Sequence, residues 1–81
     1  MDALSKNRLE SIIDNRNNGE FFIMSAYHSA KLSALINDAF KYTDMIKEST
    51  ATTIITSFRD WFDGDSRWCN VVIDDLKKNK Q

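Results

Sequence analysis

Few side chains in this chain of 81 residues could carry out chemistry, and they form no familiar catalytic pattern. The chain has one histidine, His28, and one cysteine, Cys69. Acid–base or nucleophilic catalysis needs a second group beside such a residue, and the sequence offers no obvious partner. We therefore expect His28 at the edge of a core, Cys69 as a buried thiol, and a protein that is not an enzyme. A reactive thiol activated by nearby Arg67 is the alternative for Cys69.

Three aspartates, Asp60, Asp63 and Asp65, form an acidic cluster that invites comparison with a calcium loop. A calcium loop that started at Asp63 would need an oxygen ligand at its fifth position and glycine at its sixth. The chain has Arg67 and Trp68 at these two positions. We therefore predict no metal site and no cofactor.

The same acidic residues could instead belong to a surface that binds a protein. Acidic groups around exposed aromatic side chains are typical of a contact surface for a basic partner. Asp60, Asp63 and Trp68 are therefore candidate contact residues. In the alternative interpretation, Arg59 and Arg67 neutralise the acids and both tryptophans lie in the core.

The elements that must position these residues are predicted to be helices. The chain has no proline, and its two glycines, Gly19 and Gly64, each follow a helical pattern of apolar residues. Proline breaks helices and glycine commonly ends them. The absence of proline and the positions of the two glycines therefore predict an all-α fold. Asp2 or Ser5 is the expected cap of the first helix. We predict one helical domain over residues 1–81, a small bundle of four helices at about 4–17, 20–47, 50–62 and 65–78.

The second helix, over residues 20–47, is expected to be the longest and the central element of the bundle. An alternative is that residues 20–24 form a strand and that Ser25 caps a shorter helix. The third segment is rich in threonine, which favours strands, but its apolar spacing favours a helix capped by Ser49 or Thr50. The main apolar stripe of the second helix is Phe21, His28, Leu32, Leu35, Ala39, Tyr42 and Ile46.

A second stripe on the same helix consists of Ile23, Tyr27, Ala30 and Ala34, at i, i+4, i+7 and i+11. A surface helix needs only one apolar face, so two faces predict a central position or a bound partner. Small residues such as alanine also let another helix approach closely. The alternative is that alanine stands there simply because it favours helices.

The amount of apolar surface also points to association. A chain of this length buries only about 60% of its unfolded surface, and a lone cysteine cannot form an internal disulfide. We therefore predict a homodimer, most simply with twofold symmetry. The expected core consists of Ile12, Ile13, Leu32, Leu35, Ile36, Phe40, Ile54, Ile55, Phe58, Trp61, Val72 and Leu76.

Charge and hydropathy exclude several classes of partner. Eleven basic and twelve acidic residues give a net charge of −1, so no basic field attracts nucleic acid. The longest strongly apolar run, residues 21–24, is too short to span a bilayer, and the N-terminus lacks the apolar part of a signal peptide. A lone cysteine fits a reducing compartment. We predict a cytoplasmic protein that binds no membrane, with nucleic acid as an unlikely partner.

In size, composition and expected helicity the chain is similar to bacteriocin immunity proteins and to phage-encoded inhibitors of host enzymes or defence systems. The similarity covers no motif and implies no residue role. We predict a non-catalytic protein-interaction module, an inhibitor or regulator that covers the surface of a partner protein; the alternative is a DNA-binding regulator of the helix-turn-helix type. The expected contact residues are Ile23, Tyr27, Ala30, Ala34, Asp60, Asp63 and Trp68.

Overall fold

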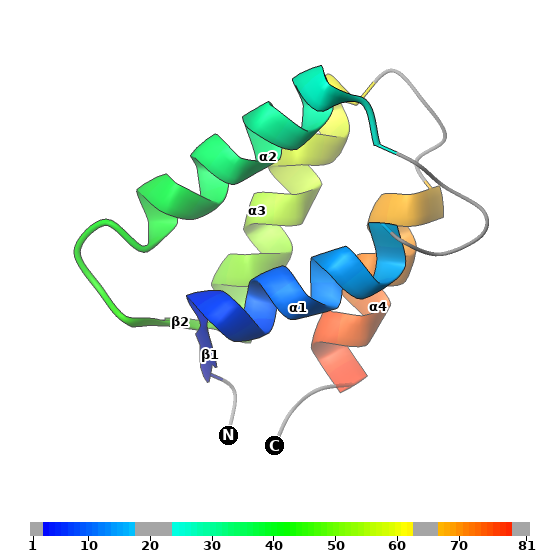
Figure 1. The fold of residues 1–81 in the computed structure, drawn as a ribbon. Coiled ribbons are helices and arrows are strands. Elements are labelled where there is room, and N and C mark those ends of the chain that lie inside the picture. The colour runs from blue at the N-terminus through cyan, green and yellow to red at the C-terminus, as the bar shows by residue number, and fades with distance from the viewer. Residues whose placement is uncertain (1–2, 18–23, 63–66, 79–81) are drawn as a thin grey trace.

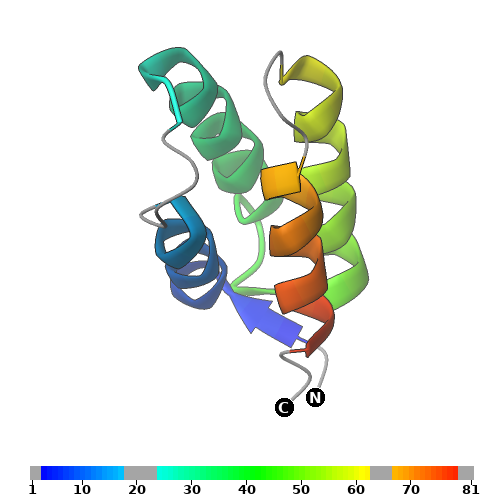
Figure 2. The ribbon, with the colours of Figure 1, turned by 90° about the vertical axis from the view of Figure 1, so that its right-hand side faces the viewer.

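The computed structural model describes residues 3–17, 24–62 and 67–78, and these residues form four helices and a small two-stranded sheet. The helices lie in two layers: α1 and α2 form one layer, and α3 and α4 form the other (Figures 1 and 2). The predicted helical fold is confirmed in its main feature, while the sheet is an addition. In chain order the elements are β1 (Ala3–Ser5), α1 (Lys6–Asn17), α2 (Ala26–Ala39), β2 (Met45–Lys47), α3 (Glu48–Trp61) and α4 (Arg67–Lys78).

The second helix is shorter than predicted, and the expectation of a long central helix is not confirmed. It begins after Ser25, as in the alternative interpretation, and ends at Ala39. Residues 20–23 lie outside the described part of the chain. After the helix, the Thr43 hydroxyl donates to the carbonyl oxygen of Met45 (2.9 Å), and the Met45 N–H donates to the Thr43 hydroxyl (3.4 Å). Such local bonds compete with helical ones, and Met45 enters a strand instead.

The two strands pair antiparallel, with Leu4 opposite Ile46. Both of these side chains are buried in the core. β1 runs directly into α1 and β2 runs directly into α3, so the sheet holds the first turns of these two helices together. The predicted helix start at Leu4 is wrong for this reason. The predicted cap Ser5 is confirmed, because its hydroxyl accepts a bond from the Arg8 N–H at 3.1 Å.

The threonine-rich third segment is helical, as its apolar spacing predicted. The Thr53 and Thr56 hydroxyls donate to carbonyl oxygens one turn earlier, which satisfies these hydroxyls within the helix. The helix begins at Glu48 after Lys47, which makes no side-chain cap, so the predicted caps at residues 49 and 50 are wrong. The predicted helix stops at Gly19 and Gly64, and the predicted start of the fourth helix at residues 65–66, lie outside the described residues.

The core lies between the two layers. The α4 helix packs against both α3 and α1, and α2 packs against α3. No described helix is long and apolar enough to cross a lipid bilayer. The buried side chains are Leu4, Leu9, Ile12, Ile13, Met24, Leu32, Ile36, Ile46, Ala51, Ile54, Ile55, Phe58, Trp68, Cys69, Val72, Ile73 and Leu76.

The predicted core is confirmed except at three positions. Leu35 and Phe40 are only partly buried, although both pack against the core. Trp61 is exposed, which contradicts its predicted place in the core. Trp68 is the buried tryptophan instead, because from the start of α4 its ring packs edge-on against Phe58 of α3.

Candidate interaction surface

The first turn of α2 is fixed by a serine cap. The His28 N–H donates to the Ser25 hydroxyl at 3.2 Å, and Ser25 has the extended backbone of an N-cap residue. The Ser25 hydroxyl is also hydrogen-bonded to Nδ1 of His28 at 2.6 Å. This double contact fixes the start of the helix and the orientation of the imidazole.

The second apolar stripe of α2 faces solvent over the residues that are described. Tyr27 is 62% exposed, and Ala30 and Ala34 are exposed as well. They follow one another at about one turn of the helix, as their spacing predicted. Ile23, the first member of the predicted stripe, lies outside the described residues.

Trp61, at the end of α3, lies beside this stripe rather than in the core. Its side chain is 46% exposed. The Lys31 Nζ lies 4.7 Å from the centroid of the Trp61 ring and 5.3 Å from that of Tyr27. A lysine ammonium over an aromatic face is attracted by the ring quadrupole, by about 0.5–1 kcal/mol at exposed sites. Lys31 therefore links the two aromatic side chains into one surface.

A shallow hollow of about 380 Å³ lies between Trp61 and the adjoining face of α2. Two of its lining residues, Lys31 and Asp38, carry opposite charges and stand at opposite ends of the hollow along α2. Small and apolar side chains lie between them. We call the whole surface the Tyr27–Trp61 patch; it consists of Tyr27, Lys31, Ala34, Leu35, Asp38 and Trp61.

The predicted acidic site around Trp68 is not assembled as expected. Trp68 is only 1% exposed, and its ring packs edge-on against Phe58 and Phe62, with centroids 6.0 and 6.5 Å apart. A partner protein therefore has no access to this side chain. Asp60 is exposed next to the patch residue Trp61, and Asp63 lies outside the described residues.

The contact between Ser25 and His28 resembles a nucleophile beside a base, but its surroundings fit a helix cap. The serine oxygen already accepts the backbone N–H of residue 28. The other imidazole nitrogen, Nε2, is buried without a hydrogen-bond partner among the described residues. The ring packs edge-on against Phe62 and Phe58, with centroids 4.9 and 6.3 Å apart, where a catalytic pair would have an orienting carboxylate. His28 thus lies at the edge of the core, as predicted.

Cys69 is a buried free thiol, as expected. Burial raises the pKa of this thiol from 9.0 to about 11, although the charge of Arg59 acts in the opposite direction. The Arg59 guanidinium donates instead to the side-chain oxygen of Asn70 on α4, at 2.8 Å. The thiol is therefore protonated near neutral pH, which does not favour the reactive alternative.

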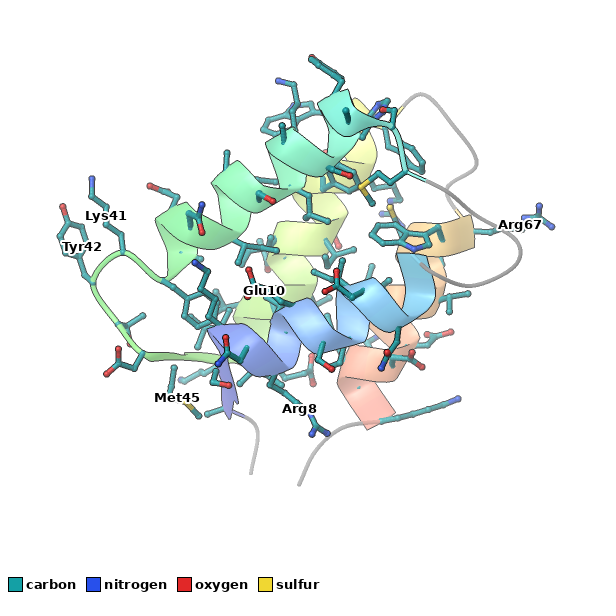
Figure 3. The ribbon with its side chains drawn as sticks, viewed as in Figure 1. Arg8, Glu10, Lys41, Tyr42, Met45 and Arg67 are labelled. Atoms are coloured by element: carbon teal, nitrogen blue, oxygen red, sulfur yellow. The ribbon has the colours of Figure 1, made fainter. Side chains whose placement is uncertain are left out.

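Tyr42 and Met45 make a separate exposed surface at the loop between α2 and β2. Tyr42 is 89% exposed and extends from the loop beside Lys41, whose Nζ lies 5.4 Å from the ring centroid (Figure 3). The apolar spacing predicted that Tyr42 lies on the main stripe of a longer helix. This prediction is wrong, because the helix ends at Ala39.

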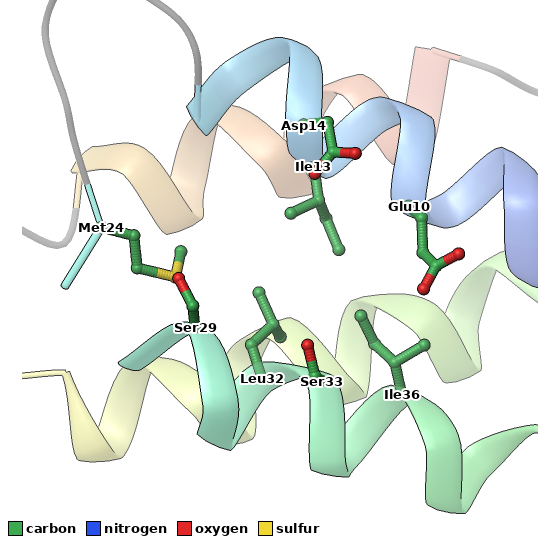
Figure 4. Close-up of a pocket in the computed structure, with 8 residues that line it drawn as sticks. All are labelled: Glu10, Ile13, Asp14, Met24, Ser29, Leu32, Ser33 and Ile36. Carbon is green, nitrogen blue, oxygen red and sulfur yellow. The ribbon is translucent and has the colours of Figure 1, made fainter. Parts of the chain in front are cut away.

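A groove between α1 and α2 is a further concave surface, and sequence reasoning missed it. It has a volume of about 270 Å³. Residues of α1 face residues of α2 across it (Figure 4). Its polar residues stand one turn apart on each helix, a spacing that could have been noticed in the sequence. The lining residues are Glu10, Ile13, Asp14, Met24, Ser29, Leu32, Ser33 and Ile36.

Within residues 3–17, 24–62 and 67–78, no group of three or more histidine, cysteine or acidic side chains is placed to hold a metal ion. No protein-family model, curated protein or solved structure matches this chain. The Tyr27–Trp61 patch and the groove between α1 and α2 are therefore the features that indicate a function.

Proposed function

We propose that this chain is a non-catalytic protein-interaction module that forms a homodimer through the Tyr27–Trp61 patch. The observation that carries the proposal is the exposure of Trp61 and Tyr27, at 46% and 62%, in a small protein whose core is built from other side chains. Aromatic side chains dominate the energy of protein interfaces, and tryptophan and tyrosine are enriched at their energetic centres.

The arrangement of charge on the patch supports a second copy of the chain as the partner. Lys31 and Asp38 are seven residues apart on α2, or about 10 Å along the helix axis. Two α2 helices that cross antiparallel about a twofold axis near Ala34 would each bring Lys31 beside Asp38 of the other copy. Twofold interfaces require this kind of self-complementarity. Ala34 is small enough to let the two helices approach closely.

The size of the chain sets a requirement on this interface. A stable interface of standard size buries roughly 800 Å² on each partner. That is about 15% of the 5201 Å² surface of this chain. The dimer therefore needs most of the exposed face of α2, including Ala30, together with Trp61 and its neighbour Asp60.

Beyond self-association, we propose that the module is a small cytoplasmic inhibitor or regulator that covers a surface of another protein. Lys31 is the one basic residue of α2, and it lies over two aromatic rings. A DNA-reading helix instead directs several cations at phosphates. This observation favours protein over nucleic acid as the partner.

Sedimentation velocity tests the proposed dimer directly. We expect the wild-type chain to sediment with twice its own mass, and Tyr27→Glu to sediment as a monomer, because a carboxylate would be buried in the interface. The matched control is Met45→Glu, which places the same charge at an exposed apolar position on β2, outside the patch, and should leave the dimer intact. Helical circular dichroism should be the same in all three proteins. The proposal would be contradicted if the wild type sedimented as a monomer, or if the two variants sedimented with the same mass.

A further inference from the structure

The groove between α1 and α2 has walls of different chemistry. The α1 wall carries two carboxylates, Glu10 and Asp14, one turn apart. The facing α2 wall carries the hydroxyls of Ser29 and Ser33, also one turn apart. The floor between them is apolar. It is formed by Ile13, Met24, Leu32 and Ile36.

Among the described residues, no cation is paired with the carboxylates of this groove. Its described lining residues include no lysine or arginine. Within the part of the chain that the structure describes, neither Glu10 nor Asp14 makes an ion pair. Both stand beside an apolar floor, where the effective dielectric constant is lower than in water and a charge pair is correspondingly stronger. An incoming cation would therefore meet two available carboxylates.

The volume of the groove limits what can occupy it. Sites for small molecules and cofactors usually measure about 300–1,000 Å³ and enclose most of the ligand. This groove measures about 270 Å³ and is open along one side. It is suited to one or two side chains of a partner that lies across it.

We propose that this groove receives a basic amphipathic helix of a partner protein. The pair Glu10 and Asp14 spans about 6 Å along α1, which matches two cations one turn apart on another helix. An apolar side chain between these cations would reach the floor at Leu32 and Ile36. Helices commonly bind to grooves in this way, with apolar anchors at i, i+3 and i+4. The same carboxylates repel the phosphates of nucleic acids and of anionic lipids.

This inference deepens the proposed function, because it gives the chemistry of the protein that the module covers. It uses a different surface, since the groove and the Tyr27–Trp61 patch share no residue. A dimer would thus carry two grooves, one on each copy. The two proposals can fail separately.

Methionine methyl groups provide a reporter for the groove. Met24 lines the groove, whereas Met45 lies on β2 outside it and is exposed. The full chain, labelled with ¹³C-methyl methionine, is titrated with a synthetic helical peptide that has leucines on one face and arginines at i and i+4. A second peptide has glutamate in place of each arginine. We expect the Met24 methyl signal to shift saturably with the arginine peptide only, while the Met45 signal stays in place.

Charge variants separate a specific groove from a general effect of net charge. The double variant Glu10→Gln with Asp14→Asn should bind the arginine peptide at least roughly tenfold more weakly, because two charge-assisted contacts are lost. The double variant Asp44→Asn with Asp74→Asn changes the net charge equally at exposed positions outside the groove. It should bind within about twofold of the wild type.

Three results would overturn the inference. One is the absence of a saturable Met24 shift up to roughly 1 mM peptide. The second is an equal loss of binding in the two double variants. The third is a Met24 shift caused by vesicles of anionic phospholipid and not by the peptide, which would assign the groove to a membrane surface. The titration is repeated on Tyr27→Glu, where the Met24 response should persist, so failure of the dimer and failure of the groove are distinguishable.

Discussion

At the scale of single residues, Ser25 determines where α2 begins. Its hydroxyl accepts the His28 N–H and contacts the imidazole, so one side chain serves both the helix end and the edge of the core. The patch and the groove lie on two sides of this helix. The serine therefore fixes the first residue of the helix that carries both surfaces.

Replacing Ser25 with alanine should lower the free energy of unfolding by about 1 kcal/mol, because a backbone donor at the first turn loses its acceptor. Urea denaturation followed by circular dichroism measures this change. Ser33→Ala is the matched control, since Ser33 is exposed within the same helix and alanine favours helices there. Equal destabilisation by both substitutions would show that the cap contributes nothing specific.

The buried thiol of Cys69 gives a second residue-scale prediction. Its pKa of about 11 lies two units above the ordinary value of 9.0, so the thiolate is about 100-fold less populated at pH 8 than in the unfolded chain. Alkylation by iodoacetamide at pH 8 should therefore be at least 100-fold slower in the native protein than in urea. Mass spectrometry follows the reaction.

The same shift has a consequence for stability. Because folding raises the pKa of Cys69, its contribution to stability is complete below pH 9 and declines as the pH rises toward about 11. Cys69→Ala should remove this decline between pH 9 and 11. Rapid native alkylation, or the same loss of stability in both proteins, would contradict the account of a desolvated thiol.

At the scale of elements, the small sheet is an anchor for two helices. Leu4 and Ile46 face each other across the strands and are both buried, at the points where α1 and α3 begin. The strand pair thereby joins the start of α1, in one layer, to the start of α3, in the other. The strands therefore matter more for stability than their three-residue length suggests.

Ile46→Ala should lower the free energy of unfolding by about 2–4 kcal/mol, because it leaves a cavity beneath the sheet. Met45→Ala, at the exposed neighbouring position, should change it by less than about 0.5 kcal/mol. Chemical denaturation of both variants makes the comparison. A cost for Ile46→Ala as small as that of Met45→Ala would mean that the sheet is not part of the core.

The sequence predicted most of the helices because their apolar spacing is regular. The spacing of Ile54, Ile55 and Phe58 outweighed the strand preference of the threonines around them, and α3 is a helix. Residues 40–47 carry a similar apolar spacing, with Tyr42 and Ile46 four apart, yet they form a loop and a strand. Three-residue strands are too short to show an alternating pattern, and their partner lies forty residues away in the sequence.

The two tryptophans show a second limit of sequence reasoning. Trp61 and Trp68 both stand at helical spacing from other apolar residues, but Trp61 is exposed and Trp68 is buried. Which one enters the core depends on where α4 packs against α3 and α1, and local spacing does not contain that information. The exposed stripe on α2 was predictable, whereas its partner Trp61 and the opposing groove needed the tertiary arrangement.

At the scale of the whole molecule, two surfaces with different chemistry lie on the two sides of α2. The Tyr27–Trp61 patch is aromatic and carries one charge of each sign, which suits a copy of itself. Among its described lining residues, the charged groups of the groove are the two carboxylates Glu10 and Asp14, which suit a basic partner and disfavour a twofold contact of the groove with itself. This division supports a dimer that keeps both of its grooves open for another protein.

The central claim is that two copies associate through antiparallel α2 helices, and a charge-exchange series measured by sedimentation equilibrium tests it most directly. Lys31→Asp and Asp38→Lys each place like charges opposite one another, so each should weaken the dimer at least roughly tenfold, while the double variant should restore it. The account predicts twice the mass of the chain for the wild type and for the double variant. A wild type with the mass of one chain, or a double variant as weak as the single ones, would contradict it.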